Sequence, residues 1–89
     1  MITGKTKSGF EFSIEDESLD NMELLDALAD VDGGNVAAIS KASILLLGKE
    51  QKKKLYDHIR GEKGNVPIES FTDELADIMN EVGKKGKNS

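Results

Sequence analysis

An almost entirely apolar segment in the middle of the chain, residues 36–47, places the strongest limit on how the chain can fold. As a helix it is apolar on nearly every side, and Gly48 ends it. Such a helix is either the central core element or partly a binding surface. The chain has 89 residues and no cysteine, so we expect one small domain of modest stability that packing holds together without disulfides.

Residues 2–14 have the pattern of a β-hairpin. Phe10, Phe12 and Ile14 alternate with polar residues, which is the period of a strand with one buried face. A Ser-Gly dipeptide before Phe10 supplies the turn, because glycine adopts positive φ readily. Two strands alone are marginally stable in water, so the hairpin is expected to lie on helices or to pair with another chain.

Helical patterns follow the hairpin. Ser18 is the expected N-cap of the first helix, which would bury a face made of Met22, Leu24, Leu25 and Leu28. A glycine pair ends this helix, and Pro67 suits the first turn of the last helix, where its missing N–H costs nothing. The predicted helices cover residues 19–31, 36–47, 49–60 and 68–82, and Thr72 or Asp73 can cap a second segment within the last one.

The fold class that these patterns predict is mainly α: a small helical domain of four to five helices with an N-terminal β-hairpin. This single domain is expected to cover residues 1–83. Residues 84–89 are rich in lysine and glycine and are expected to form a flexible basic tail.

Charge is unevenly distributed along the chain. The net charge is −5, yet residues 1–35 carry two lysines and nine acids, whereas residues 36–89 carry ten basic and eight acidic residues. This asymmetry suits head-to-tail self-association or a basic partner, and the chain lacks the basic stripe of a general nucleic-acid-binding protein. No apolar run approaches the roughly 20 residues of a membrane span, and no signal peptide is readable. We therefore expect a cytosolic protein with neither a nucleic-acid nor a membrane partner.

One motif offers a different interpretation of Ser18. The segment from Glu17 to Leu24 resembles the acyl carrier protein signature, in which a serine at the start of a helix carries phosphopantetheine. Glu17 stands where that family has aspartate, and residues 1–17 are too few for the helix and loop that precede the serine there. A helix cap requires the same residue type for another reason, so both interpretations stay open.

No arrangement of residues predicts a catalytic, cofactor-binding or metal site. His58 is the single histidine, and without cysteine it cannot form a thiol–histidine pair. Residues 64–71 look like the second half of an EF-hand loop, but residues 60–63 add one carboxylate and two cations, which excludes a Ca²⁺ ligand set. An acidic series is expected to be either a solvated helix face or a docking surface for a basic segment. Its members are Asp16, Asp20, Glu23, Asp26 and Asp30.

The order of the segments resembles the small tail assembly chaperones of long-tailed phages and prophages of Gram-positive bacteria. The resemblance covers about residues 10–82 and depends on the combination of the segments and the length of the chain. The segments that carry it are Phe10-Glu11-Phe12, Met22 to Leu28, Ile44 to Gly48, Gln51, Leu55 to Arg60, and Gly64 to Pro67.

The resemblance implies a protein that binds the tape measure protein, keeps this long helical chain soluble and promotes tail tube assembly around it. It also implies a location in the cytoplasm of the bacterial host and absence from the mature virion. In such phages a ribosomal frameshift often produces a longer form that recruits tail tube protein, and residues 83–87 suit the A-rich codons it needs. A structural tail or head-completion subunit is the main alternative.

The expected partner-binding residues are large apolar side chains of the second and last predicted helices. They are Ile44, Leu46, Leu47, Phe71 and Met79. Each also suits the core, because a domain this small needs most of its large apolar residues inside. No cofactor is expected, and the apolar segment and the charge asymmetry both favour self-association.

Overall fold

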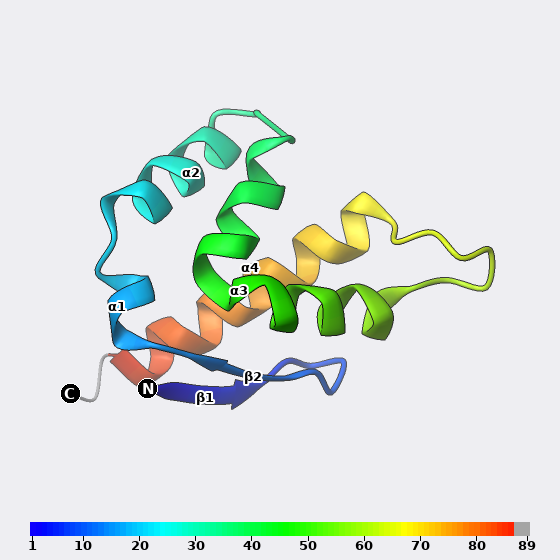
Figure 1. Ribbon diagram of the computed structural model, residues 1–89, viewed down its shortest axis with the longest axis horizontal. Coiled ribbons are helices and arrows are strands. Elements are labelled where there is room, and N and C mark those ends of the chain that lie inside the picture. Colours follow the sequence, from blue (N-terminus) through cyan, green and yellow to red (C-terminus); the bar gives the residue numbers. More distant parts are fainter. Residues whose placement is uncertain (87–89) are drawn as a thin grey trace.

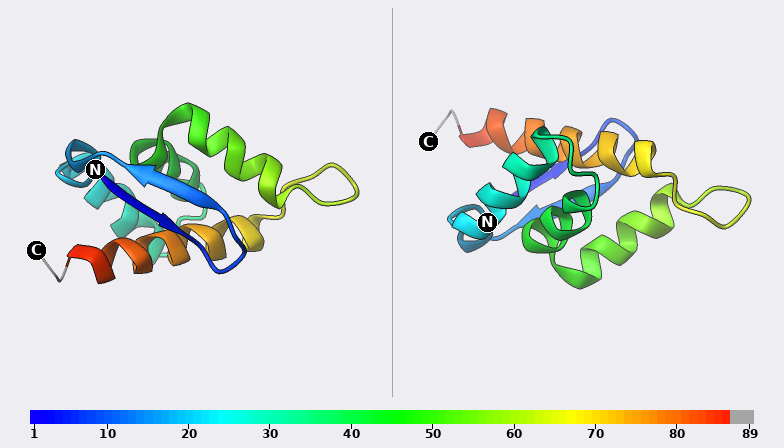
Figure 2. Two further views of the ribbon diagram at one scale, coloured as in Figure 1. Left: turned by 90° about the horizontal axis from the view of Figure 1, so that it is seen from below. Right: turned by 90° about the horizontal axis from the view of Figure 1, so that it is seen from above.

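Four helices and a two-stranded antiparallel sheet make up the structure, a computed structural model that describes residues 1–86. The predicted fold class is confirmed. The hairpin lies on one side of α4 and the second part of α3, while α2 and the first part of α3 lie on the other side (Figures 1 and 2). In chain order the elements are β1 (Ile2–Lys5), β2 (Glu11–Ile14), α1 (Asp16–Leu19), α2 (Met22–Asp32), α3 (Ala38–Ile59) and α4 (Ile68–Gly86).

The hairpin forms as predicted and contributes three buried side chains to the core. β1 pairs with β2 in a register that places Ile2 opposite Ile14. Gly9 turns the chain between them with a φ of 96°, which glycine adopts without steric cost. Phe10, Phe12 and Ile14 are buried because the hairpin packs against α3 and α4 instead of standing alone in water.

The helix predicted over residues 19–31 is wrong in its start. A separate one-turn helix, α1, precedes it, and Ser18 lies inside α1 instead of capping the longer helix. The N-cap of α2 is Asn21, whose Oδ1 accepts a hydrogen bond from the backbone N–H of Glu23 at 3.0 Å. Asparagine and serine are equally good caps, so the local pattern alone did not distinguish the two starts.

The inward face predicted for this helix is right for Leu24 and wrong for Met22 and Leu25. Leu24 and Ala27 are the residues of α2 that are buried, each 3 % exposed, and Leu28 is half-buried. Met22 and Leu25 are exposed to solvent. α2 packs mainly against α3, and this contact selects one of two apolar faces that the helix carries.

Gly48 divides α3 into two helical parts, as the sequence predicts. Its φ of 81° and ψ of 166° are far from helical values and are disfavoured for any residue with a Cβ. The first part begins later than predicted, because Val36 and Ala37 lie in a turn. Lys52 reaches across the kink to Ser40, with its Nζ 2.7 Å from the hydroxyl oxygen. This polar contact therefore links the two parts of α3 across the kink.

Alanine at Gly48 should destabilise the fold, whereas alanine at Gly83 should stabilise it. A Cβ at Gly48 would meet no atom within 4 Å, so its cost of about 1–3 kcal/mol comes from a backbone conformation that is essentially restricted to glycine. Gly83 lies inside α4 with open space around it, where alanine is favoured by about 0.5–1 kcal/mol. Urea unfolding followed by circular dichroism should give midpoints that move in opposite directions. A stabilising effect at both positions would contradict the kink.

α4 is one uninterrupted helix, without the second cap considered at Thr72 or Asp73. The Thr72 hydroxyl instead donates to the carbonyl of Ile68 at 2.8 Å, as threonines inside helices do. One face of α4 carries large apolar residues at helical spacing and closes the core. These buried residues are Phe71, Leu75, Ile78 and Val82.

The last turn of α4 extends beyond the predicted end of the domain. The helix continues to Gly86, so the flexible tail predicted over residues 84–89 begins inside a helix. Lysines in a last turn interact favourably with the negative end of the helix dipole. Lys85 also donates a hydrogen bond from Nζ to the carbonyl of Thr3 in β1. Residues 87–89 lie outside the described part of the chain.

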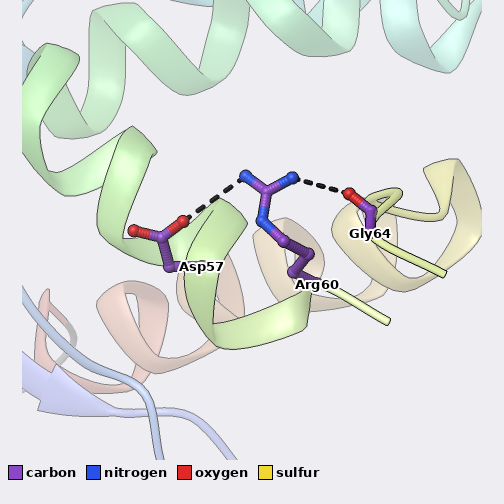
Figure 3. Close-up of polar contacts among 3 residues, drawn as sticks. All are labelled: Asp57, Arg60 and Gly64. Atoms are coloured by element: carbon purple, nitrogen blue, oxygen red, sulfur yellow. Dashed lines mark hydrogen bonds and ion pairs between the residues drawn. The ribbon is translucent and has the colours of Figure 1, made fainter. Parts of the chain in front are cut away.

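The loop between α3 and α4 is tied to the end of α3 through Arg60. Its guanidinium donates to the carbonyl of Gly64 at 2.8 Å and to the Asp57 carboxylate at 3.4 Å (Figure 3). Gly64 itself has a φ of 88°, which allows the tight turn. These contacts hold the loop against the end of α3. The chain then enters α4 from this loop.

Candidate functional site

Exposed apolar side chains gather where α2, the start of α3 and α4 meet. Two adjoining depressions lie there. The first has a volume of about 280 Å³ and is formed by the turn before α3, the second part of α3 and the start of α4. Its lining includes Val36, Ile39, Tyr56, Val66, Ile68 and Phe71.

The second depression lies between α2 and α4 and has a volume of about 520 Å³. Ile39 belongs to the lining of both depressions, so the two adjoin. We call the combined surface the apolar groove. The lining of its second part includes Leu25, Leu28, Val31, Asp32, Ala76 and Met79.

The apolar groove holds most of the large apolar surface that the domain leaves in water. Leu25, Val36 and Ile68 are 57 %, 56 % and 66 % exposed. Met22 is 66 % exposed and lies one turn before Leu25 on α2. Single exposed apolar residues are common on protein surfaces, but several gathered around two adjoining depressions are typical of an interaction site.

Sequence reasoning missed Leu25, Val36 and Ile68 as candidate binding residues. Leu25 was assigned to the buried face of a helix, and Val36 to a helix that in fact begins at Ala38. A usable signal was present, because Leu24, Ala27 and Val31 form a second apolar face one turn apart on the same helix. A helix with two apolar faces can bury only one against its own domain.

The structure distributes the five partner-binding candidates between the core and the surface. Leu46 and Leu47 are buried in the core cluster and line neither depression. Phe71 is 5 % exposed and contributes only to the lining of the first depression. Met79 is half-buried and lines the second depression, while Ile44 is half-buried outside both. Phe71 and Met79 are thus the two candidates that the fold brings to one surface.

Charges of both signs border the apolar groove. Asp32 is part of its lining. On α4, Glu69 lies three residues before the lining residue Thr72, a spacing that makes side chains neighbours on a helix. Lys52 borders the first depression, because its Nζ lies 2.7 Å from Ser40 Oγ and 5.5 Å from the centre of the Tyr56 ring, and both of these residues belong to the lining.

A polar cluster joins the hairpin turn to α3 and α4 on another side of the molecule. The hydroxyls of Thr6 and Ser8 donate to Glu74 Oε1 at 2.9 and 2.8 Å. Ser8 Oγ also lies 2.9 Å from His58 Nε2. These contacts tie the hairpin turn to α3 and α4.

The remaining sequence motifs show no built site. Ser18 is half-buried in a helix of one turn, which differs from the start of a long helix that the carrier resemblance implies. All five members of the acidic series are exposed. In the described part of the chain, no group of three acids or histidines is placed to hold a metal ion. None of its helices is both long enough and apolar enough to span a membrane.

Comparisons of the chain with protein-family models, curated proteins and solved structures found no match. The apolar groove is therefore the feature of the structure that bears on function.

Proposed function

We propose that this protein is an assembly chaperone that covers apolar surface on another protein until that protein is built into a larger structure. The observation that carries the proposal is the apolar groove, where Leu25, Val36 and Ile68 are each more than half exposed. Removing apolar surface from water is favourable by about 25 cal/mol per Å². A partner with a matching apolar face therefore gains free energy by binding there.

The partner that we propose is the tape measure protein of a long-tailed phage, in line with the resemblance of the chain to tail assembly chaperones. A long helical protein with exposed apolar stretches needs temporary cover, and a groove of this kind suits one segment at a time. The net charge of −5 on the chaperone would help to keep the complex in solution. In this role the protein acts in the cytoplasm of the bacterial host and leaves before the virion is complete.

Co-expression with the product of the long, helix-rich gene immediately downstream tests this function. We expect the long protein to be found in the soluble fraction only when the chaperone is present, and to co-purify with it. If the long protein neither binds nor gains solubility, the chaperone function is contradicted. Mass spectrometry of purified virions separates this function from that of a structural tail or head-completion subunit, because only a structural subunit remains in the particle.

A longer form made by frameshifting is a further part of the proposal. Such a form would carry an extension after the lysine-rich end of α4 and would recruit tail tube protein. The nucleotide sequence over the codons for residues 83–87 tests this directly. A slippery heptamer there supports the longer form, and its absence excludes a shift at this position.

A further inference from the structure

We propose that the apolar groove is the interface of a symmetric dimer of this chain, in which the first depression of each copy faces the second depression of the other. The two-fold axis of this dimer passes near Ile39, the residue that lines both depressions. The contact goes beyond the proposed function and does not depend on it, because it forms between two copies of the chain without any other partner.

The exposed apolar residues of the chain lie almost entirely on one face. Of the five large apolar residues that are exposed in residues 1–86, four lie at the groove or one helical turn from it: Met22, Leu25, Val36 and Ile68. The fifth is Met1, directly before β1. A copy that docked with another face would bring almost no large apolar side chain to the groove. Since burial of apolar surface drives most protein association, it favours the same face on both copies.

A two-fold contact between identical faces brings unlike parts of the groove together. In such a contact, a residue i that meets a residue j is matched by j meeting i. Because Ile39 lies where the depressions adjoin, an axis near it places the first depression of one copy over the second depression of the other. Leu25 of one copy then lies over the hollow that Val36 and Ile68 of the other copy border. Each copy thus supplies both the exposed side chains and the hollows that receive them.

The charges beside the two depressions have opposite signs. Lys52 borders the first depression, with its Nζ near Ser40 and over the Tyr56 ring. Asp32 lines the second depression, and Glu69 borders it. Within residues 1–86, neither Lys52 nor Asp32 has an ion-pair partner. The two-fold arrangement brings Lys52 of each copy toward Asp32 of the other, so opposite charges meet at two places in the interface.

The symmetric dimer differs from the head-to-tail order that the charge asymmetry of the sequence also suits. In a head-to-tail assembly two different faces meet. The groove of each copy would then be covered by a face that carries almost no exposed large apolar residue. The symmetric contact covers the apolar residues of both copies with one another, and it closes at two copies.

Sedimentation equilibrium of the full chain tests whether the dimer forms. Over a roughly hundredfold range of protein concentration, the measured mass should rise from 9.7 kDa toward twice that value. The melting temperature should rise over the same range, because dimer formation withdraws folded protein from the unfolding equilibrium. A mass that stays at 9.7 kDa at every concentration would overturn the inference.

Serine variants locate the interface. Leu25→Ser and Ile68→Ser should each weaken the dimer roughly tenfold or more, because each change removes apolar surface twice in a symmetric contact. Both positions are more than half exposed, so the monomers should stay folded, which circular dichroism checks. Lys53→Ser, exposed on the second part of α3, is the matched control and should dimerise as the original protein does. If both groove variants dimerise unchanged, another surface forms the dimer and the assignment of the groove fails.

Charge variants test the two-fold arrangement. Asp32→Lys sets two like charges against each other at each pairing, and so does Lys52→Glu. Each variant alone should self-associate roughly three- to tenfold more weakly at low salt. Lys52→Gln removes the contact with Ser40 without adding an acid, so it shows how much of the loss comes from that contact.

Mixing the Asp32→Lys and Lys52→Glu proteins should restore association. In a mixed dimer both pairings again join opposite charges, so it should form about as tightly as the original dimer. Native mass spectrometry distinguishes the mixed dimer from the two homodimers by mass. If mixing does not restore association, the two-fold arrangement is wrong.

The dimer and the proposed function are tested by different measurements. If the protein is a monomer at every concentration while the long downstream protein co-purifies with it, the inference fails and the chaperone function stands. If the dimer forms through the groove while the long protein neither binds nor gains solubility, the inference stands and the chaperone function fails.

Discussion

Replacing Ile78 by alanine is expected to lower the free energy of unfolding by about 2–5 kcal/mol, the range for large-to-small substitutions in a packed core. Ile78 is 0 % exposed and belongs to the core cluster. A small domain has a total stability of about 5–15 kcal/mol, so this single change removes a large share of it. The melting temperature should fall by about 4–8 °C for each kcal/mol lost.

Ile68 provides a matched control on the same helix. It is the same residue type, but it is 66 % exposed, so Ile68→Ala should change the free energy of unfolding by about 0.5 kcal/mol or less. Urea unfolding of both variants with one slope gives the comparison. If Ile78→Ala does not fold, Ile78→Val, with an expected loss of about 0.5–1.5 kcal/mol, replaces it. Equal losses at the two positions would contradict the orientation of α4 and, with it, the exposure of the apolar groove.

Replacing Gln51 by methionine is expected to destabilise the protein by about 1–3 kcal/mol, since it leaves part-buried backbone groups without partners. The Gln51 side chain accepts from the N–H of Ser13 at 2.8 Å and donates to the Ser13 carbonyl at 2.7 Å. It also donates to the carbonyl of Leu47 at 2.9 Å, directly before the kink at Gly48. One amide group thus joins the edge of β2 to the kink of α3.

Methionine keeps the length and helix propensity of glutamine and removes only its polar atoms. The matched control is Lys53→Met, since Lys53 is exposed on the same helix, and it should change stability by about 0.5 kcal/mol or less. Hydrogen exchange should also show faster exchange at Ser13 in the Gln51→Met protein, because its N–H loses its acceptor. A Gln51→Met protein as stable as the control would show that water replaces these hydrogen bonds without cost.

Local sequence patterns were sufficient to predict features that depend on the backbone conformation of a single residue or on a short period of apolar residues. The alternation around Phe12 predicts the hairpin, because a strand with one buried face has a period of two. Gly48 predicts the interruption of α3, since its φ of 81° is accessible to glycine and strained for other residues. Pro67 predicts the start of α4, because its fixed φ suits the beginning of a helix. In each case the physical cause lies within a few bonds of the residue.

The start and the orientation of α2 lay beyond local patterns. Ser18 and Asn21 are both good caps, and the helix carries apolar residues on two faces. The predicted face contains Leu24 and Leu25, whereas the buried face contains Leu24 and Ala27. Contact with α3 determines which face of α2 is buried, because only the face that packs against α3 is removed from water.

By itself the sequence determined the class of fold, the hairpin and the glycine-bounded ends of the helices, since these depend on backbone conformations and on periods of apolar residues. Only the tertiary structure decided where the apolar groove lies. Leu25 and Met79 are far apart in the chain, and they line one depression because α2 and α4 are both placed by α3. The residues next to Leu25 or Met79 in sequence cannot predict that the two line the same depression, because this depends on how all the helices pack around one core.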